Sequence, residues 1–255
     1  MNFLATNAVE TWYLPVDDVV SSHPWAQYED LLCREERDRA ARFLRSCDRR
    51  HYTAAHALLR VMLSSFAAVP AQMWRFRLEP QGRPEIMPGL STIPLRFSLS
   101  HTDRLVAAAV TLRRPIGLDA EALDRSFVDM DGVIRFFAAE EIAFLKRCAS
   151  EQRWQAFFEI WTMKEAFVKA TGRGLSLPLD QFAVALEPYR LLSAPSEWGS
   201  AGLWQFRVLQ PSPMHRMAVA ARGEPASALR FATSRVAAST LTPEIEPHAT
   251  ADPFP

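Results

Sequence analysis

The sequence predicts an α+β protein made of two similar α/β halves in a pseudo-twofold arrangement, with the active site in the cleft between them. Three observations support this prediction. Helical and strand-like stretches alternate along 255 residues, of which 49% are hydrophobic and 23% are charged. Each half places helices before antiparallel-looking strands. Each half also ends in an apolar strand of small residues, at 106–110 and at 218–221.

The first half is expected over residues 1–114 and begins with a strand of alternating aromatic and apolar residues. A helical stretch rich in arginine and glutamate precedes a second helix, in which Tyr52, His56 and Leu59 recur at three- and four-residue spacing. A turn at Gln81–Pro84 separates the strand-like runs that follow. The expected bounds are 11–16 for the first strand, 24–46 and 48–66 for the helices, and 74–78, 96–99 and 105–112 for the later strands.

The second half is expected over residues 115–235 and repeats this order, joined to the first near Arg113–Pro115. Arg135–Phe137 is expected to open a helical stretch, much as Arg42–Leu44 does in the first half. A long helix should stop at Gly172, a suitable C-terminal cap. The expected bounds are 153–170 for that helix, 182–186, 204–209 and 217–221 for strands, and 236–255 for a loose tail rich in Thr, Pro and Ala.

Composition and charge exclude several classes of protein. A formal net charge of zero argues against a general nucleic-acid binder. The longest apolar runs, such as 105–112, fall short of the roughly 20 residues of a membrane span. The start at Met1–Ala5 lacks the features of a signal peptide, and the three cysteines are isolated, so we expect a cytoplasmic protein. An internal repeat makes a monomer the expected state, because the second half stands in for a partner subunit.

The first of three polar clusters is the run Phe97-Ser98-Leu99-Ser100-His101, which ends a strand. Neighbouring side chains on a strand point to opposite faces, so Ser100 and His101 do not form a nucleophile–base pair. A histidine beside a hydroxyl at a strand end suits a phosphate. A plain turn with a hydrogen-bonded histidine is the commoner interpretation of such a segment.

The second cluster is Ile116-Gly117-Leu118-Asp119-Ala120-Glu121, in which an apolar strand carries two carboxylates. Asp119 and Glu121 are two residues apart, so an extended backbone places them on one face. They repel unless a cation lies between them, and Mg²⁺ takes oxygen ligands of this kind. Two solvated acids at a strand end are the alternative, and the cluster alone does not decide.

The third cluster, Trp161-Thr162-Met163-Lys164-Glu165-Ala166-Phe167-Val168-Lys169, lies inside an apolar helix. Only three of the 29 basic residues are lysine, and two of them, Lys164 and Lys169, lie here. Lysine meets a phosphate as a point charge, whereas arginine presents a broad fork. The sequence therefore predicts that the polar groups of this helix face a cleft rather than bulk solvent.

Together the clusters offer three acids, two lysines and a histidine. This inventory suits Mg²⁺-assisted displacement at a phosphate, in which cations offset the charge of a pyrophosphate and a carboxylate takes a proton from the nucleophile. The residues by themselves do not name the nucleophile. They also contain no Walker loop and no dinucleotide-binding fingerprint.

In order and spacing, the motifs resemble the larger, pseudo-dimeric 4′-phosphopantetheinyl transferases of the surfactin-synthetase-activator type. The resemblance rests on Gly82-Arg83-Pro84, on the three clusters and on Gly172-Arg173-Gly174-Leu175, and it spans about residues 10–225. It implies transfer of the phosphopantetheine arm of coenzyme A to a serine of an apo acyl or peptidyl carrier protein. Carriers of nonribosomal peptide, polyketide or siderophore assembly are the partners implied, with those of fatty-acid synthesis as a further option.

The resemblance also implies roles for single residues. Asp119, Glu121 and Glu165 correspond to the Mg²⁺ ligands, and Glu165 to the base that activates the carrier serine, directly or through a water. Lys169 corresponds to the residue that stabilises the pyrophosphate and the leaving group. The larger apolar residue that the family places between the two strand carboxylates is replaced here by Ala120, which should point away from the metal.

Further residues correspond to contacts with coenzyme A. Ser100 and His101 match such contacts, with His101 on a phosphate, and Arg83 and Pro84 match the pair near the nucleotide. Arg39 aligns more loosely with a 3′-phosphate contact, and a solvated helix face is the alternative for it.

Two other functions remain open on the sequence alone. One is a non-catalytic module that binds a carrier protein or coenzyme A. The other is a Mg²⁺-dependent hydrolase of a coenzyme A-like pyrophosphate, which would release 3′,5′-ADP with no carrier present.

Overall fold

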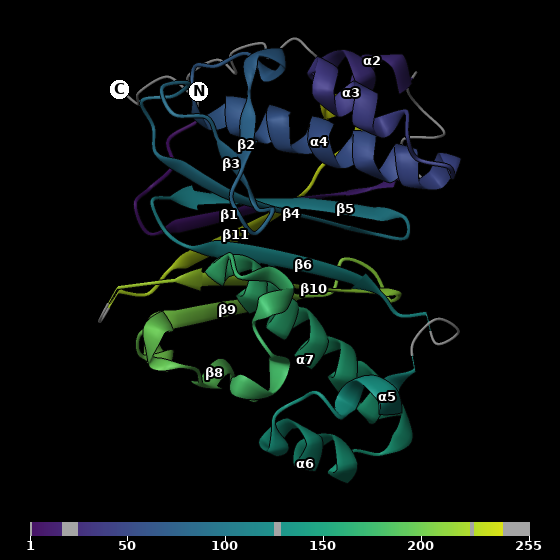
Figure 1. The fold of residues 1–255 in the computed structure, drawn as a ribbon, viewed down its shortest axis with the longest axis vertical. Coiled ribbons are helices and arrows are strands. Elements are labelled where there is room, and N and C mark those ends of the chain that lie inside the picture. Colours follow the sequence, from purple (N-terminus) through teal and green to yellow (C-terminus); the bar gives the residue numbers. More distant parts are fainter. Residues whose placement is uncertain (1, 17–24, 125–128, 225–226, 242–255) are drawn as a thin grey trace, which may run out of the picture.

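Two β-sheets lie face to face in the centre of the molecule, and a long helix covers the outer side of each (Figure 1). The computed structural model describes residues 2–16, 25–124, 129–224 and 227–241. The helices are α2 (Trp25–Leu31), α3 (Arg34–Ala40), α4 (Ser46–Phe66), α5 (Met130–Ile134), α6 (Ala139–Arg147) and α7 (Ser150–Thr171). The strands are β1 (Ala8–Pro15), β2 (Phe76–Leu78), β3 (Pro84–Ile86), β4 (Leu95–Thr102), β5 (Leu105–Leu112), β6 (Ile116–Ala122), β7 (Ala183–Leu186), β8 (Tyr189–Ser193), β9 (Trp204–Leu209), β10 (His215–Arg222) and β11 (Arg230–Arg235).

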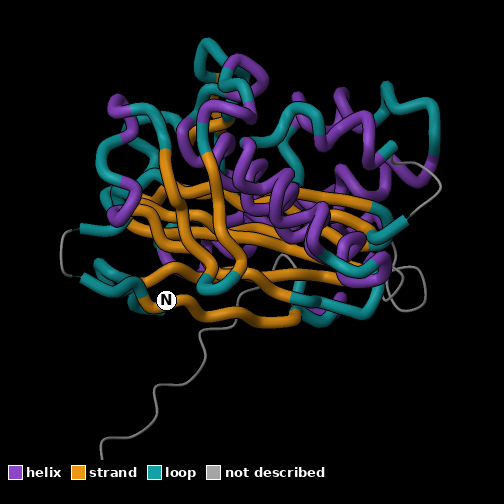
Figure 2. The backbone as a smooth tube through the Cα atoms, turned by 90° about the horizontal axis from the view of Figure 1, so that it is seen from below, coloured by secondary structure: helices purple, strands orange, loops and turns teal. Residues whose placement is uncertain are grey.

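The strand order repeats between the two sheets. The first sheet runs β11-β1-β5-β4 and the second runs β6-β10-β9-β8-β7, with β2 and β3 forming a separate ribbon. The view turned by 90° shows most strands running across the middle and lower part of the molecule, with helices around them (Figure 2). The mixture of helices and sheets confirms the α+β prediction. The matching orders β1-β5-β4 and β6-β10-β9 are what an internal repeat requires, while the twofold relation itself stays a prediction.

Alternation along the strands builds three layers of apolar packing. In β5, Val106, Ala108 and Val110 face α4, whereas Leu105, Ala107 and Ala109 face the other sheet. In β10, Ala218 and Ala220 face α7, and the residues between them face the first sheet. The small side chains of both central strands allow the two sheets to approach closely, which explains the apolar small-residue strands seen in the sequence.

The two long helices confirm their predictions. The structure places α4 over the segment expected at 48–66, and α7 over the segment expected at 153–170. Gly172 ends α7 in the left-handed region at φ 74°, and its N–H bonds back to the carbonyls of Val168 and Lys169. The strands expected at 105–112 and 204–209 have those bounds in β5 and β9.

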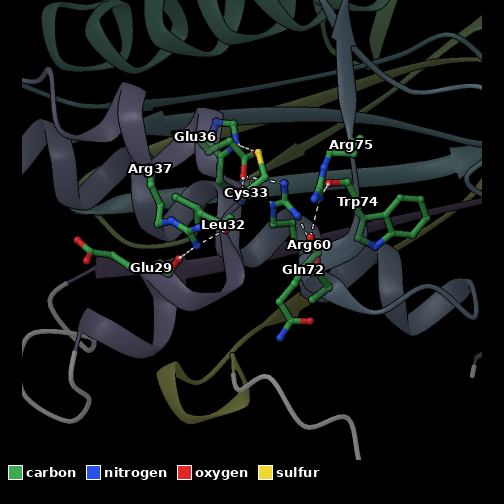
Figure 3. A network of polar contacts seen from close by, with 11 residues as sticks. Glu29, Leu32, Cys33, Glu36, Arg37, Arg60, Gln72, Trp74 and Arg75 are labelled. Carbon is green, nitrogen blue, oxygen red and sulfur yellow. Dashed lines mark hydrogen bonds and ion pairs between the residues drawn. The ribbon is translucent and has the colours of Figure 1, made fainter.

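The helical stretch expected over 24–46 is not continuous. It forms two short helices, α2 and α3, separated at Leu32 and Cys33, and residue 24 lies outside the described residues. Cys33 is extended, with φ −73° and ψ 169°. Its N–H donates to the Glu36 carboxylate at 3.0 Å, which starts a new helix and prevents the first from continuing (Figure 3).

Glu36 also anchors this segment in the interior. Its carboxylate lies 2.7 Å from the guanidinium of Arg60 and 2.8 Å from the ring of His56, both on α4. Burial raises the pKa of Glu36, but the hydrogen bond from His56 and the charges of His56 and Arg60 outweigh it and lower the value to about 2. Arg60 is itself buried and donates to the carbonyl of Ala71 at 2.7 Å. The network in Figure 3 thus fixes α3 against α4.

Other expectations also differ from the structure. Arg135–Phe137 forms the turn between α5 and α6 and does not open a helix. The sequence prediction missed β8 and β11. Strand β11 pairs in parallel with β1, which lies near the other end of the sequence. Arg42–Leu44 likewise lies in a turn, between α3 and α4, so the two segments still occupy corresponding places.

The segment expected as a loose tail begins with packed residues. Val236, Ala238 and Leu241 are buried in the core of the first half, and the carbonyl of Ala238 accepts a hydrogen bond from Tyr28 at 2.8 Å. Residues 242–255 lie outside the described residues. Within the described ranges, no helix is long and apolar enough to cross a membrane.

Candidate active site

Strand β6 presents its two carboxylates toward α7. Leu118 and Ala120 point into the core between the sheets, so Asp119 and Glu121 share the opposite face, as the sequence predicted. At Gly117 the helix comes so close that an added Cβ would lie 1.9 Å from the backbone oxygen of Ala166. A glycine is therefore required at this crossing, and it brings the carboxylates against the helix.

Helix α7 faces these carboxylates with three side chains at four-residue spacing. Trp161, Glu165 and Lys169 fall on one face of the helix. The indole N–H of Trp161 donates to Glu121 Oε1 at 3.0 Å, and Lys169 Nζ lies 2.7 Å from Asp119 Oδ1. The acids expected to work together therefore lie across one strand–helix interface.

Strand β4 closes a third side through Ser100. This buried hydroxyl lies 3.2 Å from Asp119 Oδ1 and 3.0 Å from Lys169 Nζ. His101, the next residue, is exposed on the opposite side, as the alternation of a strand requires. The structure thus separates two residues that the sequence offered as one cluster.

Burial and a neighbouring negative charge raise the pKa values of two carboxylates of the site. Burial and the charge of Asp119 raise the pKa of Glu121 to about 7, although the Trp161 N–H and Lys169 act against them. Burial and Asp119 also raise the pKa of Glu165, with Lys169 opposing. Within the described part of the chain, no hydrogen bond holds the Glu165 carboxylate. Raised pKa values in a partly closed site are typical of groups that bind or transfer protons.

The acids are chemically suited to a hard cation. Asp119 Oδ2 is buried and has no hydrogen-bond partner among the described residues, while Oδ1 is held by Ser100 and Lys169. A buried carboxylate oxygen without a donor is costly, and a divalent ion satisfies it. Among the described residues, no three His, Cys, Asp or Glu side chains converge closely enough to hold a metal ion by themselves. The oxygen donors present thus fit a hard cation in their chemistry. The structure does not bring Glu165 together with Asp119 and Glu121 as a set of three metal ligands.

A hollow of about 250 Å³ opens beside Lys169. Its lining includes Gly82, Arg83, Pro84 and Ser98 from the first half, together with Gly172 and Gly174. The Arg83 guanidinium donates to the carbonyls of Ala170 at 3.1 Å and Ile116 at 3.3 Å. Arg83 therefore ties the ribbon of the first half to the end of α7 and the start of β6, and borders the hollow at the same time.

His101 and Arg39 lie apart from this centre. Although the His101 side chain is exposed to solvent, the protein around it desolvates the imidazole in part, and the positive charges of His51 and Lys169 act with this desolvation to lower its pKa. Arg39 is exposed on α3, where its guanidinium lies over the ring of Tyr52, and it borders a different hollow of about 640 Å³. No contact in the described residues joins Arg39 to the carboxylates.

Lys164 contradicts the expectation that the polar groups of α7 face a cleft. Its side chain is fully buried, 2.7 Å from Glu141 and 2.7 Å from the carbonyl of Phe182. Glu141 also accepts the N–H groups of Ala138 and Val184. The residue next to Glu165 thus points away from the site, because successive helical positions face different directions. It ties α7 to α6 and β7.

Two contributors were missed by sequence reasoning. Trp161 is given no role of its own from the sequence, although its place four residues before Glu165 puts its N–H on the polar face of the helix. Gly117 gave a weaker signal, because one glycine in a strand marks a close approach without naming its neighbour.

Carboxylates that meet a lysine beside an arginine-bordered hollow are typical of an enzyme that acts on a phosphorylated ligand. Comparison of the chain with protein families gives the particular class. Residues 115–219 match the model of the 4′-phosphopantetheinyl transferase superfamily, and residues 20–113 match that of the 4′-phosphopantetheinyl transferase N-terminal region. The chain belongs to the 4′-phosphopantetheinyl transferase family, which confirms the resemblance drawn from its motifs.

Similar proteins cover most of the chain. The 4′-phosphopantetheinyl transferase HetI of Nostoc sp. is 34% identical over 224 residues, which is 86% of this chain and 90% of that protein. The 4′-phosphopantetheinyl transferase Sfp of Bacillus subtilis is 30% identical over 171 residues, 67% of this chain and 74% of its own length. The two matched family segments meet between residues 113 and 115, while the division into halves stays a prediction.

Proposed function

We propose that the protein transfers the 4′-phosphopantetheine arm of coenzyme A to a serine of an apo carrier protein and releases 3′,5′-ADP. One observation carries the proposal: in a chain of this family, Lys169 lies 2.7 Å from Asp119 while Glu121 and Glu165 lie on the same two elements. Lys169 also lines the hollow, so a cation paired with one acid of the strand–helix interface borders a space that a phosphate ligand can enter, as a reaction that replaces a pyrophosphate bond by a serine phosphodiester requires.

The nucleotide end of coenzyme A is assigned to the hollow beside Lys169. Arg83 and Pro84 border it on one side, and Lys169 on the other. His101 lies outside the lining of this hollow and is kept as a phosphate contact on the resemblance; because its pKa is lowered, it would act there as a hydrogen-bond donor and not as a cation. Arg39 is kept as a 3′-phosphate contact on the resemblance alone.

The family pattern assigns Mg²⁺ to Asp119, Glu121 and Glu165. The Oδ2 of Asp119 supports this assignment, because it is a buried carboxylate oxygen without a hydrogen-bond donor among the described residues. Mg²⁺, when bound, offsets the negative charge of the pyrophosphate. The acids supply oxygen ligands only, which suits this ion better than a softer metal.

The residues of the chain then move one proton and stabilise one leaving group. The carrier serine oxygen forms a bond to the phosphorus that bears pantetheine, and the bond from that phosphorus to the bridging oxygen of 3′,5′-ADP breaks. Glu165 takes the serine proton, directly or through a water, from its place on α7 one turn before Lys169. The Lys169 ammonium stabilises the charge left on the departing phosphate.

Intact mass spectrometry of the carrier tests this function. The protein is incubated with coenzyme A, Mg²⁺ and a panel of apo carrier proteins from peptide, polyketide, siderophore and fatty-acid assembly. The proposal expects a phosphopantetheine mass gain on at least one carrier, with 3′,5′-ADP released in equal amount. Carrier binding without a mass gain would indicate a non-catalytic module, and 3′,5′-ADP released without any carrier would indicate a hydrolase.

Location and assembly complete the proposal. We infer a cytoplasmic monomer, because coenzyme A and carrier proteins are substrates of that compartment and because the chain supplies both sides of the cleft itself. Sedimentation at several concentrations checks the monomer, and a species that gains mass with concentration contradicts it.

A further inference from the structure

In this structure the Ser100 hydroxyl uses its full hydrogen-bonding capacity within the protein. A serine hydroxyl donates one hydrogen bond and accepts two. Ser100 Oγ accepts from the N–H of Ala120 at 3.2 Å and from Lys169 Nζ at 3.0 Å, and it donates to Asp119 Oδ1 at 3.2 Å. The side chain is also buried. A direct contact with coenzyme A, which the resemblance implies for this serine, would have to displace one of these bonds.

Ser100 belongs to a ladder of hydroxyls that joins the two sheets. Ser98, Ser100 and Thr102 are alternate residues of β4, and each hydroxyl accepts a backbone N–H of β6. The distances are 2.9 Å to Leu118, 3.2 Å to Ala120 and 3.0 Å to Ala122. The ladder fixes the position of β6, and only its middle member also touches charged groups of the candidate site.

The consequence concerns the triangle formed by Ser100, Asp119 and Lys169. The Lys169 side chain is one-third exposed and would be mobile if the carboxylate alone held it. A second acceptor on β4 holds the ammonium on Oδ1, which leaves Oδ2 of Asp119 without a hydrogen-bond partner among the described residues. One hydroxyl therefore decides where the lysine lies and which carboxylate oxygen stays available.

We propose that Ser100 is a positioning residue that orients Lys169 and Asp119 for the transfer reaction. The inference rests on the proposed function. It assigns the first half of the chain a part in the chemistry of the second, since β4 supplies the group that aligns residues of β6 and α7.

A double-mutant cycle separates positioning from direct contact. Ser100→Ala should lower kcat/KM for transfer by about tenfold or more, as loss of an outer partner of a functional group does. Ser100→Ala added to Lys169→Met should cost little beyond Lys169→Met alone, because the serine acts through the lysine. Ser100→Thr, which keeps the hydroxyl, should restore most of the activity. The inference would be overturned if the losses in kcat/KM of the two single variants multiplied in the double variant. It would also be overturned if Ser100→Ala left kcat/KM unchanged.

Thr102→Val is the matched control. It removes the neighbouring bond of the same ladder, to Ala122, from a residue that touches none of the charged groups. Thr102→Val and Ser100→Ala should lower the unfolding midpoint to a similar extent, and only Ser100→Ala should lower transfer. An equal loss of transfer in both variants would reduce Ser100 to a member of a structural ladder and overturn its special role.

The three lysines of the chain allow a test that does not depend on activity. In protein labelled with ¹³C at lysine Cε, three side-chain signals are expected, from exposed Lys146, buried Lys164 and Lys169. Ser100→Ala should shift the Lys169 signal and leave that of Lys164 in place. An unmoved Lys169 signal contradicts the inference. If the wild-type protein transfers nothing to any carrier, the proposed function fails by itself, whereas this signal still reports whether Ser100 holds Lys169.

Discussion

Replacing Gly117 by alanine should separate the two elements that build the site. An added Cβ would lie 1.9 Å from Ala166 O and 2.4 Å from Ala170 N, and both are backbone atoms that cannot rotate away. Ordinary contact begins near 3.4 Å, so α7 must retreat from β6 by about 1.5 Å. That shift exceeds what the 2.7 Å contact between Lys169 and Asp119 can absorb.

The expected losses follow from that displacement. Misplacement of reacting groups by about 1 Å costs roughly 100-fold in rate, so kcat/KM for phosphopantetheine transfer should fall by at least that factor. Overpacking should also lower the free energy of unfolding by about 1–3 kcal/mol. Urea unfolding and the intact-mass transfer assay measure the two effects on the same preparation.

Gly202→Ala is the matched control for this variant. An added Cβ there would meet only the Ser200 hydroxyl, at 3.8 Å, which is ordinary contact. Its stability should stay within about 0.5 kcal/mol of wild type, with transfer unchanged. If Gly117→Ala behaved like Gly202→Ala, the close crossing of β6 and α7 would not be what positions the site, and the reasoning would be refuted.

Three further predictions concern residues around the site and the core. Lys164→Met should lower the free energy of unfolding by about 3–5 kcal/mol, because it leaves the buried carboxylate of Glu141 without its ion-pair partner. The control Lys146→Met, at an exposed lysine, should change the free energy of unfolding by less than about 0.5 kcal/mol. Equal values for the two variants in urea unfolding would contradict the role of the buried pair. Trp161→Phe keeps an aromatic ring but removes the hydrogen-bond donor to Glu121, so kcat/KM in the transfer assay should fall by about tenfold. An unchanged kcat/KM would show that this hydrogen bond does not contribute to transfer. The pKa of Glu36 is lowered to about 2, so its ion pairs stabilise the fold above the unfolded value of 4.5 and are lost as the pH falls from there toward 2. Urea unfolding at about pH 6 and about pH 3 should therefore show a loss of about 2 kcal/mol that Glu36→Gln does not share, and parallel losses in the two proteins would contradict this prediction.

The chemistry-bearing residues could be predicted from the sequence where a local period fixed their direction. Two-residue spacing placed Asp119 and Glu121 on one face of β6, and four-residue spacing placed Glu165 and Lys169 on one face of α7. Each relation lies within a single element, so no knowledge of the fold was needed. The family motifs then supplied the order in which those elements meet.

What the sequence did not predict depends on contacts between elements. Lys164 has the same neighbours in sequence as the site residues, and only the packing of α6 and β7 shows that its partner is Glu141. The break near Cys33 depends on Arg60, which lies in the next helix and holds Glu36. Strand β11, near the C-terminal end of the described residues, pairs with β1 near the N-terminal end. Pairing between strands so far apart in the sequence leaves no local pattern in it.

The same contrast explains the altered interpretation of Ser100. In the sequence it stands beside His101, and the pair suggests a ligand contact. In the structure the two side chains face opposite ways, and the hydroxyl is shared between Ala120, Lys169 and Asp119. The grouping that matters joins three elements, β4, β6 and α7, rather than two adjacent residues.

The central claim is that Glu165 works with the β6 carboxylates to transfer phosphopantetheine from coenzyme A. Intact-mass time courses of one responsive apo carrier, with wild-type protein and with Glu165→Gln at equal concentration, test it most directly. The wild-type protein should convert the carrier to its phosphopantetheine form, and Glu165→Gln should be slower by roughly two or more orders of magnitude while it remains folded. Equal rates for the two proteins would contradict the role of Glu165.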